Sequence, residues 1–185
     1  MAQNRKQKTV SQRRRKAVRK VECTNCGATA RVVRGSYDFA ESGLKRVRLQ
    51  GIELIVCDQC GNVDPIIPRV NDLMRLLAIA VIAKPYRLAG DEIRFLRKYL
   101  RMTGDEFGRL LHINRTNLSK WENDEDRVGA QSDRLVRAIA LSLGDGLRGK
   151  LEEVIRKFPE IRDEPAAMRI DMDTEKMSYQ YVEGA

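Results

Sequence analysis

The chain has 185 residues, of which 42% are hydrophobic and 33% are charged, and its net charge at pH 7 is +9. This length is enough for one ordinary domain or two small ones. The basic N-terminus lacks the apolar run of a signal peptide, and no apolar stretch is long enough to span a membrane, so we expect a soluble intracellular protein.

The first twenty residues hold the whole net charge. Residues 1–20 contain nine of the 35 basic residues and no acid, whereas the remaining 26 basic residues balance the 26 acidic ones. So polar a segment cannot form a core by itself, and we expect it to be disordered. Two interpretations stay open: an arm that follows the phosphates of a nucleic acid, or a solubilising tail without a defined partner.

Two identical Cys-x-x-Cys-Gly motifs use all the cysteines of the chain, namely Cys23, Cys26, Cys57 and Cys60. Two such pairs supply four thiolates to one tetrahedral zinc ion, and the glycine after each pair tolerates the positive φ that the turn needs. A redox dithiol would need only one pair, and a disulfide framework fits an intracellular protein poorly. We predict one structural zinc ion, because four protein ligands leave no position for water or substrate.

The zinc-binding module is predicted to cover residues 21–70. A β-prone run at 28–33 follows the first motif, and a longer run at 44–56 precedes the second, with Gly51 marking a bend or bulge. The two runs predict an antiparallel, zinc-ribbon-like build. Because so short a module buries little surface, we expect the metal to supply much of its stability.

The segment 71–87 contains a predicted helix that ends at Pro85. The helix is apolar on all sides, which indicates that it is buried. It either packs as a connecting helix between the zinc module and the following domain or forms a dimer interface.

The segment 88–146 carries four predicted helices. A capping box of Thr103 and Glu106 opens the second helix. A short turn that begins at His112 leads to the third helix, 115–122. We interpret His112 as a turn residue in a left-handed backbone conformation, and not as a metal ligand or a base.

The helical periodicity assigns a set of apolar side chains in these helices to a core. The side chains expected to face inward include Phe107, Leu110, Leu111, Leu118, Trp121, Leu135, Val136 and Leu143. This assignment leaves Arg115, Thr116, Asn117 and Lys120 on or near the opposite face of their helix.

The run 106–123 reads Glu-Phe-Gly-Arg-Leu-Leu-His-Ile-Asn-Arg-Thr-Asn-Leu-Ser-Lys-Trp-Glu-Asn and resembles the helix-turn-helix of the Xre (phage-repressor) family. In this chain Gly108 stands where a small alanine is usual, and His112 where glycine is usual. The resemblance implies that helix 115–122 enters the major groove of DNA.

The exposed face of that helix supplies the candidate DNA contacts. Arginine and lysine pair with guanine and asparagine with adenine, while short polar side chains near helix ends contact phosphates. The candidates are Arg115, Thr116, Asn117 and Lys120 for bases, and Thr103, Ser119 and Asn123 for phosphates. The alternative is that these residues only form a solvated face.

The two motifs together resemble the MqsA/YgiT-type antitoxin family over residues 21–145, and the segments 37–44 and 90–98 are similar to it as well. The resemblance implies a prokaryotic, cytoplasmic protein whose zinc module contacts a cognate toxin. It further implies a helix-turn-helix dimer that binds palindromic operators, represses its own operon and is associated with the nucleoid when bound. Thr116 and Lys120 fall where family members carry an asparagine and an arginine that read bases.

The C-terminal segment 147–185 gives weaker signals. A helix is predicted over 147–158, and Pro159 ends it. The alternation of apolar and polar residues at 168–173 is a weak strand signal for pairing with a partner or a second subunit, but we expect this tail to be disordered.

We therefore predict an α+β fold in which a small β-rich, zinc-ribbon-like module precedes an all-α Xre-type helix-turn-helix domain. The predicted function is sequence-specific autorepression by a homodimer on an inverted repeat, because one short helix reads too few bases. The alternatives are an antitoxin that neutralises a toxin through the zinc module, and RNA binding, for which only Tyr37 and Phe39 could stack on bases. A single histidine, no nucleophile arrangement and no Gly-rich phosphate loop argue against an enzyme, so no catalytic residue and no cofactor besides zinc is predicted.

Overall fold

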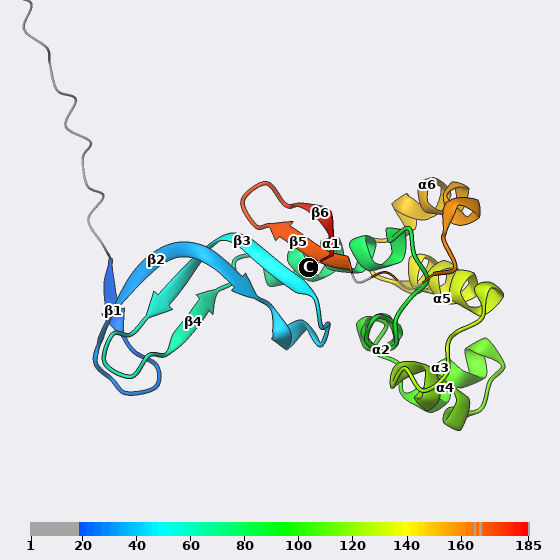
Figure 1. Ribbon diagram of the computed structural model, residues 1–185, viewed down its shortest axis with the longest axis horizontal. Coiled ribbons are helices and arrows are strands. Elements are labelled where there is room, and N and C mark those ends of the chain that lie inside the picture. Colours follow the sequence, from blue (N-terminus) through cyan, green and yellow to red (C-terminus); the bar gives the residue numbers. More distant parts are fainter. Residues whose placement is uncertain (1–18, 165, 167, 185) are drawn as a thin grey trace, which may run out of the picture. The chain divides into compact units, whose positions relative to one another are not determined.

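The computed structural model describes residues 19–164, 166 and 168–184, so almost all of the basic tail lies outside the described residues. Within them, six strands form one mixed sheet with the order β1-β2-β3-β5-β6, and β4 also pairs with β3 (Figure 1). The strands are β1 (Lys20–Glu22), β2 (Thr29–Asp38), β3 (Val47–Val56), β4 (Val63–Ile66), β5 (Met168–Asp173) and β6 (Ser178–Glu183).

The described residues also form six α-helices. They are α1 (Val70–Ala83), α2 (Gly90–Tyr99), α3 (Gly104–Leu111), α4 (Arg115–Glu122), α5 (Ala130–Leu143) and α6 (Leu151–Arg156). Single 3₁₀ turns lie at 40–42, 148–150 and 158–160.

The chain divides into two compact units. Unit 1 consists of the described residues up to Val33 together with Leu54–Asp64, and unit 2 consists of Arg34–Glu53 and the chain from Pro65 onward. The long strands β2 and β3 run through both units.

Unit 1 has a very small core. Its strand β1 pairs antiparallel with β2, with Lys20 opposite Arg31. The buried cluster consists of Cys23, Ala30 and Cys57. So little apolar surface cannot stabilise a module of this size without a further cross-link.

Unit 2 combines sheet and helices. Its part of β3 pairs with β5 in parallel, with Val47 opposite Ile170, and β5 pairs with β6 antiparallel. The β5–β6 hairpin lies beside α1 (Figure 1), and the hydroxyl of Tyr181 donates to the carbonyl of Ala80 at 2.7 Å. Leu73, Leu77 and other apolar residues of α1 are buried, so packing within the chain accounts for the apolar character of this helix.

The prediction of a small β-rich module followed by a separate all-α Xre-type domain is wrong. The fold is α+β, but the six-stranded sheet includes the C-terminal strands β5 and β6, and the helices belong to the same compact unit as these strands. The reason is the parallel pairing of β3 with β5, which lies more than one hundred residues further along the chain. The weak alternation at 168–173 does form a strand, so the expectation of a disordered tail is wrong there.

Several side chains that the helical pattern assigned to a core are instead exposed. Leu110 and Leu135 are each 45% exposed, and Leu143 is 49% exposed. Trp121 is only half-buried, whereas Leu118 is buried as predicted.

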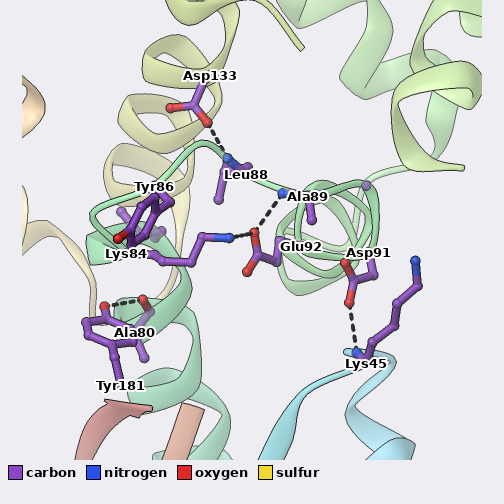
Figure 2. A network of polar contacts seen from close by, with 12 residues as sticks. Lys45, Ala80, Lys84, Tyr86, Leu88, Ala89, Asp91, Glu92, Asp133 and Tyr181 are labelled. Carbon is purple, nitrogen blue, oxygen red and sulfur yellow. Dashed lines mark hydrogen bonds and ion pairs between the residues drawn. The ribbon is translucent and has the colours of Figure 1, made fainter. Parts of the chain in front are cut away.

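A network of buried polar groups fixes the start of α2 (Figure 2). The carboxylate of Glu92 accepts from the ammonium of Lys84 and, at 2.7 Å, from the backbone N–H of Ala89. The N–H of Leu88 donates to Asp133 at 2.7 Å. Since unpaired buried polar groups are costly, these bonds fix the chain path between α1 and α2.

Candidate metal centre and nucleic-acid interface

The four cysteine sulfur atoms lie within 4.8 Å of one another. The Sγ atoms of Cys23 and Cys60 are 3.7 Å apart, and those of Cys26 and Cys57 are 3.6 Å apart. Four ligands at a Zn–S distance of about 2.3 Å would lie about 3.8 Å from each other in a regular tetrahedron. The cluster fits a single structural metal site, and all four predicted ligands contribute to it.

The two motifs fold into matching turns. Gly27 has φ of +75° and Gly61 of +74°, a backbone conformation that other residues rarely adopt. The N–H of each glycine donates at 3.0 Å to the carbonyl of the first cysteine of its motif, that of Cys23 or of Cys57. The repeated sequence therefore forms two similar turns that bring their thiols to one point.

Backbone donors and neighbouring thiols shift the pKa values of two of the four thiols. The backbone N–H of Asn62 lowers the pKa of the Cys60 thiol to about 6. The N–H of Ala28 also lowers the pKa of Cys26, but hydrogen bonds with the neighbouring thiols, first that of Cys60, outweigh it and raise this pKa to about 12. A bound divalent cation would favour the thiolate form of all four.

The α3–turn–α4 segment is closely defined by local contacts. Thr103 caps α3, and its hydroxyl accepts from the N–H of Glu106 while the Glu106 carboxylate accepts from the N–H of Thr103, as predicted. His112 has the predicted left-handed backbone, with φ of 56°. A Cβ atom on Gly108 would lie 2.9 Å from the carbonyl oxygen of Ile113, so glycine permits this tight turn.

The predicted DNA-contact residues lie at two adjoining places. Arg115, Thr116, Asn117 and Ser119 are exposed on α4, and Lys120 is half-exposed. Thr103 is the N-cap of α3, and Asn123 is the C-cap of α4, where its amide donates to the hydroxyl of Ser119 at 3.3 Å.

Two of these basic side chains are paired with exposed acids. Arg115 lies 3.3 Å from Asp105, and Lys120 lies 3.5 Å from Asp126. Exposed pairs of this kind contribute only about 0.2–1 kcal/mol each. They therefore orient the two cations without holding them strongly.

The sequence did not indicate the ion pairs that anchor α4. The carboxylate of buried Glu122 accepts two hydrogen bonds from Arg97 of α2, at 2.6 and 2.9 Å. The carbonyl of Glu122 accepts a further bond from Arg94, at 2.8 Å. No local pattern reveals such contacts, because α2 and α4 are separated in the chain by α3.

A second anchor lies just after α4, at Asp124. Its carboxylate accepts from the N–H of Gly90 at 2.6 Å and from the ammonium of Lys45 at 2.9 Å. Burial would raise the pKa of Asp124, but these two donors outweigh it and hold the pKa below its usual range. Asp124 therefore fixes the loop after α4 to the start of α2.

Comparison of the chain with protein-family models, with curated proteins and with solved structures gives no match. The resemblance to the antitoxin family therefore stays a prediction. Among the described helices, none combines the length and the apolar character that crossing a membrane requires.

Proposed function

We propose that this protein binds double-stranded DNA sequence-specifically through α4 and that the four cysteines hold one structural zinc ion. The observation that carries the proposal is the two-sided character of α4. Leu118 and Glu122 are buried, whereas Arg115, Thr116 and Asn117 are exposed and each carries a polar group. A short helix with one buried side and one exposed polar side suits the major groove of DNA. An α-helix fits into that groove, where base edges offer hydrogen-bond donors and acceptors.

The exposed side chains match the chemistry of base edges. The guanidinium of Arg115 offers two parallel donors for O6 and N7 of guanine, and the amide of Asn117 both donates and accepts, as adenine requires. Lys120, one turn after Thr116, supplies a further cation for guanine or phosphate. To reach DNA, Arg115 and Lys120 must leave Asp105 and Asp126, which is a small loss because these pairs are exposed.

We further propose that the protein acts as a homodimer on an inverted repeat, in the manner of an autorepressor. One helix of eight residues reads too few base pairs for specificity within a genome. The exposure of Leu110 on α3 and of Leu135 and Leu143 on α5 supports association, because a second copy would cover apolar side chains that the monomer leaves in water.

The role of the proposed zinc ion is to stabilise unit 1. When bound, it would cross-link the two turns that carry the cysteines, and four thiolates would leave no open coordination position for catalysis. The small buried cluster of unit 1 supports this role, because metal binding then supplies much of its folding free energy.

The proposal is tested by selecting DNA from a random duplex library with the zinc-loaded protein. We expect a recurrent motif with two-fold symmetry for the wild type and no motif for Arg115→Ala/Lys120→Ala. The matched control is Arg156→Ala/Lys150→Ala, which removes the same charges from exposed ion pairs outside the α3–α4 segment. A motif that survives in the double variant of α4 would contradict reading by this helix.

A further inference from the structure

We propose that unit 2 contains a binding site for a small organic carboxylate with an apolar body, located between α2, α4 and the loop 124–128. The site is a cavity of about 270 Å³, which is smaller than the sites that hold drug-sized ligands. All of the residues that carry the argument belong to unit 2.

The cavity has an apolar lining with charged groups at its rim. Leu88, Ile93, Trp121 and Val128 supply the apolar surface. Ala89 also lines the cavity. The backbone N–H groups of Leu88 and Ala89 are held by hydrogen bonds to Asp133 and Glu92, which fixes this wall of the cavity (Figure 2). These apolar side chains would accept a branched aliphatic chain or an aromatic ring and exclude a fully hydrated ion.

Most of the charged groups at the cavity are already neutralised. Lys84 is paired with Glu92, Asp124 with Lys45, and Asp126 with Lys120. Arg127 is exposed and forms no ion pair with any residue that the structure describes. The unpaired charge at the cavity is therefore that of Arg127, and Arg87 is paired with Asp163.

Arg87 has an incomplete set of partners. Its side chain is only 19% exposed, and its Nη2 atom lies 2.6 Å from a carboxylate oxygen of Asp163. Its Nε atom is buried and, within the described part of the chain, has no hydrogen-bond partner. A carboxylate normally binds Nε and Nη2 of an arginine together, with one oxygen on each nitrogen. Asp163 contacts only Nη2, so Nε has no partner among the described residues.

A ligand carboxylate can replace the carboxylate of Asp163 at Arg87. Asp163 is 69% exposed, so it can leave Arg87 and become hydrated with little loss. A ligand carboxylate in its place would accept from both Nε and Nη2 after a small turn of the guanidinium, while its apolar part fills the cavity. The ligand would thus satisfy a buried donor that is otherwise unpaired.

The site is in contact with the proposed reading helix, and this step depends on the proposed function. Trp121 belongs to α4, and the loop 124–128 follows that helix directly. A ligand seated against both would change the stability or position of α4. The site would therefore act as an effector site that alters the affinity for DNA.

The binding test uses Trp121 as its reporter, because it is the only tryptophan of the chain. Benzoate and 3-methylbutanoate are titrated into the full zinc-loaded chain, each beside its uncharged amide, with fluorescence and calorimetry as readouts. We expect saturable binding of the carboxylates and at least about tenfold weaker binding of the amides, because the amides lack the charge that Arg87 recognises. Saturation absent up to about 10 mM, or equal binding of acid and amide, would overturn the site.

Two variants make the assignment specific. Arg87→Gln should weaken carboxylate binding about tenfold or more, whereas Asp163→Asn should strengthen it, because the competing carboxylate is gone. The matched control Arg156→Gln removes a guanidinium from an exposed pair on α6 and should leave binding unchanged. Asp163 is exposed, so its variant keeps the test valid even if Arg87→Gln fails to fold.

The effector role has its own readout. The affinity for the selected DNA is measured with and without the carboxylate that binds best, and we expect at least a threefold change that its amide does not produce. An unchanged affinity would overturn the effector role. Because the ligand titration contains no DNA, failure of the site and failure of the proposed DNA binding are distinguishable.

Discussion

Arg97 of α2 and Glu122 of α4 form a two-pronged ion pair, with Nε–Oε1 and Nη2–Oε2 distances of 2.6 and 2.9 Å. The pair lies on the buried side of α4, away from the face that carries Thr116 and Lys120. It therefore fixes the orientation of that face relative to α2.

Glu122→Ala is expected to lower the free energy of unfolding of unit 2 by about 3 kcal/mol, because it leaves the largely buried Arg97 without its partner. The measurement is urea denaturation of the zinc-loaded protein. Glu125→Ala, which changes an exposed glutamate three residues further on, is the control and should be nearly neutral. Equal effects of the two substitutions would show that the Arg97 pair does not stabilise α4.

His112→Gly should stabilise the protein by about 0.5–1 kcal/mol, because His112 has a left-handed backbone that glycine adopts without strain. Gly108→Ala should have the opposite effect, since its Cβ would meet the carbonyl of Ile113 at 2.9 Å. Thermal denaturation of the two variants checks both signs. A destabilised His112→Gly protein would mean that the imidazole makes a contact worth more than the strain.

Asp124→Asn should destabilise unit 2 at pH 6 by at most about 1 kcal/mol, because the lost pair with Lys45 is partly exposed. The pKa of Asp124 is lowered in the folded protein from its ordinary value of 3.8. Its charge therefore contributes stability above that value, and the contribution disappears as the pH falls through the lowered pKa.

The difference in unfolding free energy between wild type and Asp124→Asn should thus shrink as the pH is lowered from 6 to 3. Loss of metal at low pH affects both proteins equally and cancels in the difference. A difference that grows on acidification would contradict the lowered pKa.

Removal of the metal should unfold unit 1 and leave unit 2 largely folded, because the buried cluster of unit 1 is very small. We expect one zinc ion per chain by elemental analysis and its loss in Cys57→Ser. Hydrogen exchange after chelation should increase in β1 and in the turns at Gly27 and Gly61, while α1 and α2 stay protected. Uniform exchange of the whole chain would contradict the separate role of the metal.

Local patterns in the sequence were sufficient for the parts of the fold that depend on neighbouring residues. The repeated Cys-x-x-Cys-Gly motifs predicted the thiol cluster, because each turn is formed within five residues. The capping box at Thr103 and the left-handed His112 were predicted for the same reason.

Contacts between distant residues could not be predicted in this way. The parallel pairing of Val47 with Ile170 joins segments with no shared local signal, and it makes the all-α domain prediction wrong. The exposure of Leu135 likewise depends on which face of α5 the rest of unit 2 covers, which periodicity alone does not determine.

The central claim is that α4 reads DNA, and binding to the DNA upstream of this protein's own gene tests it most directly. The affinity of zinc-loaded wild type and of Arg115→Ala/Lys120→Ala is measured on that DNA and on a shuffled duplex at one fixed salt concentration. We predict that the wild type prefers the upstream DNA and that the double variant loses this preference while keeping weak binding to both duplexes. A wild type that binds both duplexes equally would contradict the account and direct attention to protein partners of unit 1.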